Sequence, residues 1–170
     1  MSRIDRVLSH PWLTVRVQIL LGLFFIIAAL PKIVDPPSFA QMIYNYKLVA
    51  SEFAGVNVLN LMALALPWLE LMVGLALVLG IWRRTAVLLT GAMLVVFIVA
   101  ISINLARGNA IDCGCFDPAG SNKTVEQKFL DMGWTIVRDV GMLAMVVQIW
   151  FGMLRERVEN LPLISTELPS

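Results

Sequence analysis

The sequence predicts an all-α fold, an integral membrane four-helix bundle, from two observations. Of the 170 residues, 59% are hydrophobic and only 15% are charged, whereas soluble domains have about 45–50% apolar and about 25% charged residues. Four segments are also apolar over the roughly 20 residues that a helix needs to cross a bilayer. The formal net charge is +1 with no run of basic residues, so nucleic-acid binding is not expected.

The predicted spans cover residues 12–30, 59–82, 85–106 and 132–154. We expect them to form a single membrane domain over residues 1–170, because the connections are too short for a second domain. Four glycines within the spans are expected to allow close contacts between helices. These glycines are Gly22, Gly74, Gly133 and Gly141.

The first span also resembles a signal peptide, because Arg3 and Arg6 precede its apolar run. We expect a retained helix instead, since the run is long enough to cross a membrane and reaches Pro31 without a clear small-x-small cleavage site. Pro31, Pro36 and Pro37 are expected to stop this helix and keep the following chain extended. Proline lacks the N–H that a continuing helix would use.

The connection after the first span contains a stretch of mixed apolar and polar residues from Phe39 to Phe53. This pattern is typical of a short helix that lies on the membrane surface. It fits an ordered loop packed on the helix ends equally well. Both interpretations stay open at the level of sequence.

The number of spans is even, so both termini are expected on the side of the membrane that holds the tight turn between the second and third spans. Basic residues favour this side by seven to five, and the positive-inside rule assigns it to the cytoplasm. The seven are Arg3, Arg6, Arg16, Arg83, Arg84, Arg155 and Arg157, and the five are Lys32, Lys47, Arg107, Lys123 and Lys128. We therefore expect a multi-pass plasma-membrane protein whose two long connections face the outside or the periplasm.

Cys113 and Cys115 stand on either side of Gly114 in the most polar part of the chain. Residues two apart lie at most about 7 Å from Cα to Cα, so a disulfide between the two cysteines is geometrically possible. A ring this small is strained and therefore labile, which suits electron exchange. It would constrain the unfolded chain very little, which disfavours a purely structural disulfide.

A metal site is the other interpretation of the two cysteines. A structural zinc site needs four nitrogen or sulfur ligands, and the single histidine, His10, is predicted at the opposite membrane face. Two thiolates suit copper(I), alone or with a methionine. Copper(I) handling is therefore an alternative, although no residue is assigned as a metal ligand.

Ionisable groups within or beside the spans form a second candidate site. Glu70 lies in the second span, Arg138 and Asp139 lie in the fourth, and Lys32 follows the first. Charged groups at such depth are costly, usually face the bundle interior and are functional candidates. Asn104, near the outer end of the third span, completes a set that the predicted topology gathers beneath the cysteines, with Glu70 deepest.

Such a set could hold a small polar or quinone-like head group. Arg138 or Asn104 would donate hydrogen bonds, and Glu70 or Asp139 would exchange protons. A Glu70–Arg138 ion pair that only fixes helix packing explains the charges equally well.

Several short motifs together resemble the MauE branch of the DoxX-like membrane proteins. The motifs run Leu30-Pro31-Lys32-Ile33 with Asp35-Pro36, Tyr44, Leu66-Pro67-Trp68-Leu69-Glu70 with Gly74, Arg107-Gly108, Asp112-Cys113-Gly114-Cys115-Phe116 and Arg138-Asp139. The resemblance implies a four-helix inner-membrane protein associated with redox chemistry. For the MauE branch it implies assistance with disulfide formation in the maturation of methylamine dehydrogenase, and for the DoxX side it implies quinone-linked complexes.

We therefore expect a membrane thiol-disulfide redox protein in which Cys113 and Cys115 support the maturation of a periplasmic oxidoreductase. Its expected partners are the lipid bilayer and a periplasmic redox partner or client. The candidate cofactor is a quinone near Glu70, Asn104 and Arg138, which would make the protein a quinone-linked oxidoreductase. The alternatives are a non-enzymatic anchor or assembly subunit of a quinone-linked DoxX-type complex and, third, copper(I) handling.

Overall fold

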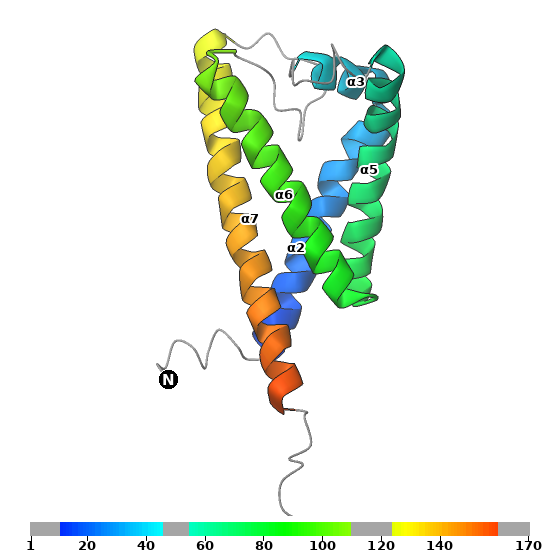
Figure 1. Ribbon diagram of the computed structural model, residues 1–170, viewed down its shortest axis with the longest axis vertical. Coiled ribbons are helices and arrows are strands. Elements are labelled where there is room, and N and C mark those ends of the chain that lie inside the picture. Colours follow the sequence, from blue (N-terminus) through cyan, green and yellow to red (C-terminus); the bar gives the residue numbers. More distant parts are fainter. Residues whose placement is uncertain (1–10, 46–54, 110–123, 160–170) are drawn as a thin grey trace, which may run out of the picture.

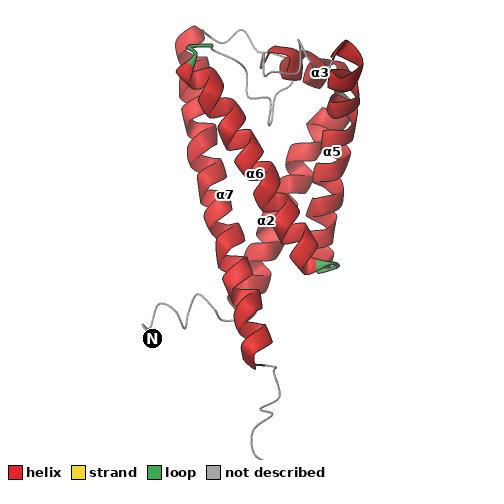
Figure 2. Ribbon diagram, in the orientation of Figure 1, coloured by secondary structure: helices red, strands yellow, loops and turns green. Residues whose placement is uncertain are grey.

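The structure, a computed structural model, describes residues 11–45, 55–109 and 124–159, and all regular structure in these ranges is helical (Figure 2). The helices are α2 (Pro11–Val34), α3 (Pro36–Asn45), α5 (Gly55–Leu79), α6 (Arg83–Ala106) and α7 (Val125–Glu159). All except α3 contain a stretch that is long and apolar enough to cross a membrane. This confirms the predicted all-α fold, and the chain is a multi-pass membrane protein.

The long helices form two sides that diverge toward one end of the bundle. On one side α2 packs along α5, and on the other α6 packs along α7. Figure 1 shows the two sides standing apart at the end that carries α3, whereas α2 and α7 come together near the opposite end. The bundle is therefore wide at the α3 end, where α3 lies next to α5.

The first helix continues through Pro31 to Val34, so the prediction that Pro31 stops it was wrong. The carbonyl oxygen of Pro31 accepts a hydrogen bond of 3.1 Å from the backbone N–H of Asp35, which closes the last turn. The expected extended chain after this helix is also absent from the described residues. Pro36 begins α3 instead, because the fixed φ of proline suits the first position of a helix.

Asp35 caps the start of α3 with its carboxylate. Its Oδ1 accepts a hydrogen bond from the backbone N–H of Ser38 at 3.3 Å, and its Oδ2 accepts one from the Ser38 hydroxyl at 2.6 Å. A side-chain acceptor at this position satisfies N–H groups that have no partner inside the helix. The sharp change of direction between α2 and α3 is thus built from one aspartate and the two prolines that follow it.

Helix α3 packs at the wide end of the bundle, against α5 and α2. Of the two alternatives left open by the sequence, residues 39–45 follow the helical one. Residues 46–53 lie outside the described part of the chain. Its Phe39 and Met42 are buried in an apolar cluster with residues of α5, α6 and α7. The other buried members of this cluster are Ala63, Ala100, Ile101 and Met132.

The opposite half of the bundle holds a larger apolar cluster from α2, α5, α6 and α7, with Leu21, Leu77, Val87 and Ile149 almost completely buried. Helix α5 ends at Leu79, short of the predicted span end at residue 82, because the chain turns there. Gly80 and Trp82 have φ values of +70° and +47°. Glycine adopts this left-handed region readily, whereas Trp82 is a non-glycine residue held in it by the tight turn into α6.

Candidate functional site

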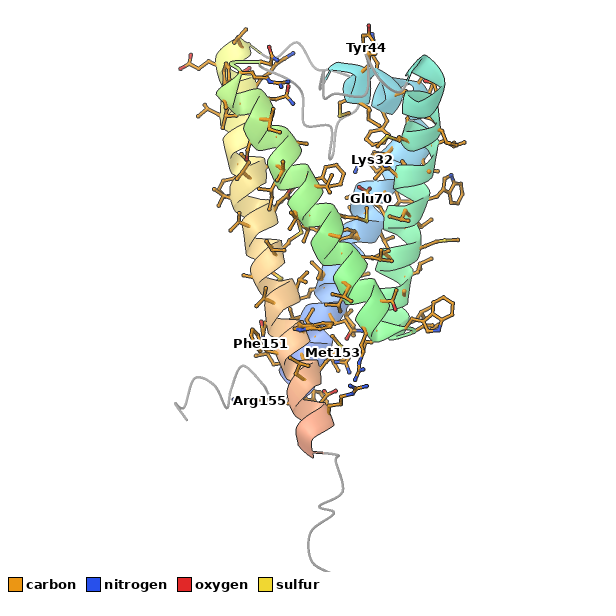
Figure 3. The ribbon with its side chains drawn as sticks, in the orientation of Figure 1. Lys32, Tyr44, Glu70, Phe151, Met153 and Arg155 are labelled. Atoms are coloured by element: carbon orange, nitrogen blue, oxygen red, sulfur yellow. The ribbon has the colours of Figure 1, made fainter. Side chains whose placement is uncertain are left out.

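Lys32 on α2 and Glu70 on α5 form an ion pair inside the bundle (Figure 3). The Lys32 Nζ donates to both carboxylate oxygens of Glu70, at 2.7 Å each. Both residues are only 3% exposed. Burying two charges costs desolvation free energy, which is offset only by close geometry and further favourable contacts. The short contacts of this pair supply the first of these.

Two aromatic rings supply the further contacts. The Lys32 Nζ lies 5.3 Å from the ring centroids of both Phe39 on α3 and Phe97 on α6. A cation at this distance is attracted by the negative face of an aromatic ring. Lys32 therefore joins four helices, since it belongs to α2 and contacts side chains of α3, α5 and α6.

Arg138 and Asp139 form a second charged pair, on α7. The Nε and Nη2 atoms of Arg138 donate to Oδ1 of Asp139 at 3.1 and 2.9 Å. The guanidinium carbon also lies 5.1 Å from the ring centroid of Phe24 on α2. Consecutive residues on a helix do not normally face each other. The Arg138 side chain is long enough to contact both the neighbouring Asp139 and Phe24 on α2.

Both charged pairs line one small cavity of about 30 Å³. The rest of its wall is apolar and comes from α2, α6 and α7. These apolar residues are Phe24, Phe25, Ala28, Leu94, Phe97 and Met142. Among the described lining residues the charges balance, because Lys32 is paired with Glu70 and Arg138 with Asp139.

This arrangement differs from the predicted Glu70–Arg138 ion pair. Glu70 pairs with Lys32, and Arg138 pairs with Asp139. The cavity is also small for the predicted quinone-like head group, since a cavity of about 150 Å³ is needed to take benzene. The volume of the cavity is enough for one or two water molecules.

Comparison with known proteins finds a match along most of the chain. The family model described as "Methylamine utilisation protein MauE" matches residues 10–153. The chain belongs to the MauE family. All four residues of the two charged pairs fall within the matched range.

Three curated proteins, each named methylamine utilization protein MauE, are similar to the chain. That of Methylorubrum extorquens AM1 is 40% identical over 110 residues, which is 64% of this chain and 56% of the relative. Those of Paracoccus denitrificans and Methylophilus methylotrophus are 34% and 30% identical over similar lengths. The aligned part thus spans little more than half the length of these MauE proteins. No solved structure matches the chain.

Asn104, the fifth residue of the predicted intramembrane site, does not line the cavity. It is completely buried near the end of α6, and its Nδ2 donates to the carbonyl oxygen of Ala100 at 3.0 Å. Its Oδ1 is buried without a hydrogen-bond partner in the part of the chain that the structure describes. The structure therefore brings together four of the five intramembrane candidates and leaves Asn104 apart.

Cys113 and Cys115 lie outside the described residues. The chain that leads to them leaves α6 through a defined cap. The N–H groups of Arg107, Gly108 and Asn109 donate to carbonyls of the last turn, and Gly108 has a φ of +69°. Among the described residues no group of three or more His, Cys, Asp or Glu side chains is arranged to hold a metal ion.

Sequence reasoning missed a second polar layer at the other end of the MauE bundle. Gln18 on α2 donates from Nε2 to the carbonyl oxygen of Leu77 on α5 at 2.6 Å, and its Oε1 accepts from Arg83 Nε on α6. Arg83 Nη1 lies 3.3 Å from Glu156 on α7. The signal was present in the sequence, because Gln18 is an uncharged polar residue within an apolar span.

Proposed function

We propose that this MauE family chain is a membrane accessory protein of methylamine utilisation whose cysteines exchange electrons with a protein outside the cytoplasm. Membership of the MauE family is the observation that carries the proposal. The three relatives bear the name methylamine utilization protein. The client would be a periplasmic oxidoreductase of the methylamine dehydrogenase type that needs disulfides in order to mature.

The arrangement of α6 and α7 supports a role for the connection between them. The end of α6 and the start of α7 lie at the same end of the bundle as α3 (Figure 1). Cys113 follows Asn109 by four residues, so its Cα can stand at most about 14 Å from that of Asn109. The cysteines therefore remain within reach of the α3 end, where a protein on that side of the membrane could contact them.

The chemistry proposed is thiol-disulfide exchange. When Cys113 and Cys115 form a disulfide, a thiolate of the client attacks one sulfur and a mixed disulfide results. A second client thiolate then attacks the mixed disulfide, the client becomes disulfide-bonded, and the two cysteines leave as thiols with two electrons. Their reoxidation requires a second disulfide of a partner protein, which takes up the same two electrons and becomes a dithiol.

The proposed topology has cytoplasmic termini and an outward-facing cysteine segment in the plasma membrane. Tyr44 and Arg155 lie at opposite ends of the bundle (Figure 3). The arginines at the start of α6 and at the end of α7 are thus gathered at the end away from α3. Their position supports the orientation, since positively charged residues favour the cytoplasmic side.

The test replaces each cysteine by serine in cells that require methylamine dehydrogenase. We expect Cys113→Ser and Cys115→Ser each to abolish maturation of the enzyme while the membrane protein remains at normal abundance. The matched control is Ser102→Ala, a change at an exposed position of α6 that leaves both cysteines in place. Full maturation with either cysteine variant refutes the exchange role and supports a non-enzymatic assembly subunit.

A second measurement addresses the topology and the resting redox state. Intact cells are treated with a membrane-impermeant maleimide, with and without prior reduction. Labelling only after reduction supports an outward-facing disulfide. Labelling without reduction contradicts a resting disulfide, and absence of labelling under both conditions contradicts an exposed, outward-facing position.

A further inference from the structure

The two carboxylates that line the cavity differ in how their oxygens are used. Both oxygens of Glu70 accept hydrogen bonds from Lys32. Asp139, in contrast, receives both hydrogen bonds from Arg138 on the same oxygen, Oδ1. Within the described part of the chain, Oδ2 of Asp139 therefore has no hydrogen-bond donor.

A carboxylate oxygen that receives no hydrogen bond from the protein needs water to replace its lost hydration. Asp139 is 3% exposed, yet its Oδ2 is not among the completely buried atoms that lack a partner in the described residues, so a water molecule can reach this oxygen. The adjoining cavity can hold the water molecule that would donate to Oδ2. Its volume of about 30 Å³ exceeds the roughly 10–15 Å³ that one water needs, and water requires two to four polar partners, which the charged pairs supply.

The cavity lies close to the α3 end and far from the other one. Lys32 is within the last turn of α2 and its Nζ lies 5.3 Å from the ring centroid of Phe39 on α3, so the cavity lies on the α3 side of the bundle. Toward the opposite end, Gln18 lies 14 residues earlier on α2, which is about 21 Å of helix. The larger apolar cluster fills the bundle between these two levels, so exchange with solvent has its short path on the α3 side.

We propose that this cavity is a hydrated site in which water donates to Oδ2 of Asp139, and that Asp139 exchanges its proton with the aqueous phase on the α3 side. Glu70 has the different task of balancing Lys32. The site is independent of the cysteine chemistry proposed above, because neither Cys113 nor Cys115 takes part in it.

Three charged groups among the described residues face Asp139. Arg138 is on the same helix, Lys32 comes from α2 and Glu70 from α5, whereas α6 contributes only Leu94 and Phe97 to the cavity wall. A proton on Oδ2 changes the acceptor into a hydroxyl that donates to the bound water. Arg138 can donate to Oδ1 whether Oδ2 is protonated or not, so Asp139 can bind and release a proton without a rearrangement of α7.

Infrared difference spectroscopy tests the assignment. Spectra of the full chain in lipid vesicles are recorded over a pH series in H₂O and in D₂O. We expect a carboxylic-acid carbonyl band that decreases as pH rises and shifts in D₂O. The band is absent in Asp139→Asn and unchanged in Asp131→Asn, a matched change on an exposed part of the same helix.

Two results overturn the proposal. One is a band of the same intensity in Asp139→Asn and in the unmodified protein. The other is an Asp139 band that D₂O leaves in place, since this means a dry site. If Asp139→Asn does not assemble, Asp139→Glu keeps an acid at the cavity and must show the band at an altered frequency. An unaltered band in that variant also overturns the assignment.

The sidedness is tested by a pH step applied outside vesicles of known orientation. With the α3 side outward, the Asp139 band changes together with the external pH. With the opposite orientation, it changes only after the internal pH has followed. The reverse order contradicts a path on the α3 side. Because these readouts do not involve disulfides, they are unaffected by the outcome of the cysteine experiments.

Discussion

Gly22 on α2 and Gly74 on α5 lie against each other, backbone to backbone. A Cβ added at Gly74 would stand 2.9 Å from the carbonyl oxygen of Gly22, and one added at Gly22 would stand 2.7 Å from the carbonyl oxygen of Gly74. Neither oxygen can move aside as the end of a flexible side chain could. This contact holds α2 and α5 at a short separation, and the Lys32–Glu70 pair joins the same two helices nearer α3.

Gly74→Ala is therefore expected to force α2 and α5 apart. Overpacking of a close contact typically costs about 1–3 kcal/mol, and we expect a loss of this size in the free energy of unfolding. Equilibrium unfolding of the purified protein in mixed detergent micelles measures it.

Gly141→Ala is the matched control, because the space around Gly141 is open. Alanine is favoured over glycine in a helix by up to about 1 kcal/mol, so this variant should be as stable as the original protein or more stable. Equal destabilisation by both substitutions would show that the α2–α5 contact has no special weight. Gly133 and Gly141 were both expected to pack closely, and within the described residues neither does.

The Lys32–Glu70 pair leads to a prediction about charge balance. Lys32→Met leaves Glu70 as a buried carboxylate without its cation, which typically costs about 3–5 kcal/mol. The double substitution Lys32→Met with Glu70→Met removes both charges, and replacement of a buried ion pair by apolar side chains is often neutral or stabilising. We expect the double variant to be more stable than the single one in the same unfolding experiment.

The control for the Lys32 substitution is Arg84→Met, which removes a cation from an exposed position in the first turn of α6. Exposed substitutions usually change stability by less than about 0.5 kcal/mol. A double variant that is less stable than Lys32→Met would mean that packing, and not charge balance, accounts for the effect at this site.

Hydropathy was enough to predict an all-helical membrane fold, because the bilayer requires long apolar helices whatever their packing. It could not predict α3 or the continuation of α2 through Pro31, since local hydrogen bonds of Asp35 decide both. The sequence also identified Lys32, Glu70, Arg138 and Asp139 as unusual charges. It could not tell which cation pairs with which carboxylate, because that depends on how α2, α5 and α7 cross.

Phe39 is expected to hold α3 in place. It is 3% exposed, and its ring faces Lys32 as well as the apolar cluster under α3. Phe39→Ala removes both contacts, and truncation of a buried phenylalanine costs about 3–5 kcal/mol. Amide hydrogen exchange of residues 36–45 should become much faster, because α3 would undock more often than the long helices unfold.

Tyr44→Ala provides the comparison for Phe39, since Tyr44 lies on the same helix and is 57% exposed. Exchange in α3 should remain close to that of the original protein. Unchanged exchange in Phe39→Ala would instead show that the prolines and the Asp35 cap are sufficient to keep α3 on the bundle.

The polar layer around Gln18 is expected to fasten the end of the bundle away from α3. Gln18→Ala removes the acceptor of Arg83 Nε and one donor to the carbonyl oxygen of Leu77. Arg83 Nη2 is already buried without a partner in the described residues, so the substitution leaves two guanidinium nitrogens unsatisfied. A buried donor without an acceptor costs about 1–3 kcal/mol, and we expect a loss of stability in this range.

Glu156→Gln tests whether this cost arises from buried hydrogen bonds or from the ion pair with Arg83. The Glu156 side chain is 38% exposed and its contact with Arg83 is 3.3 Å long. Exposed ion pairs contribute about 0–1 kcal/mol, and glutamine keeps an oxygen acceptor, so this variant should lose less than Gln18→Ala. If Glu156→Gln proves the more damaging of the two, the link between α6 and α7 is electrostatic, and Gln18 does not fasten this end of the bundle.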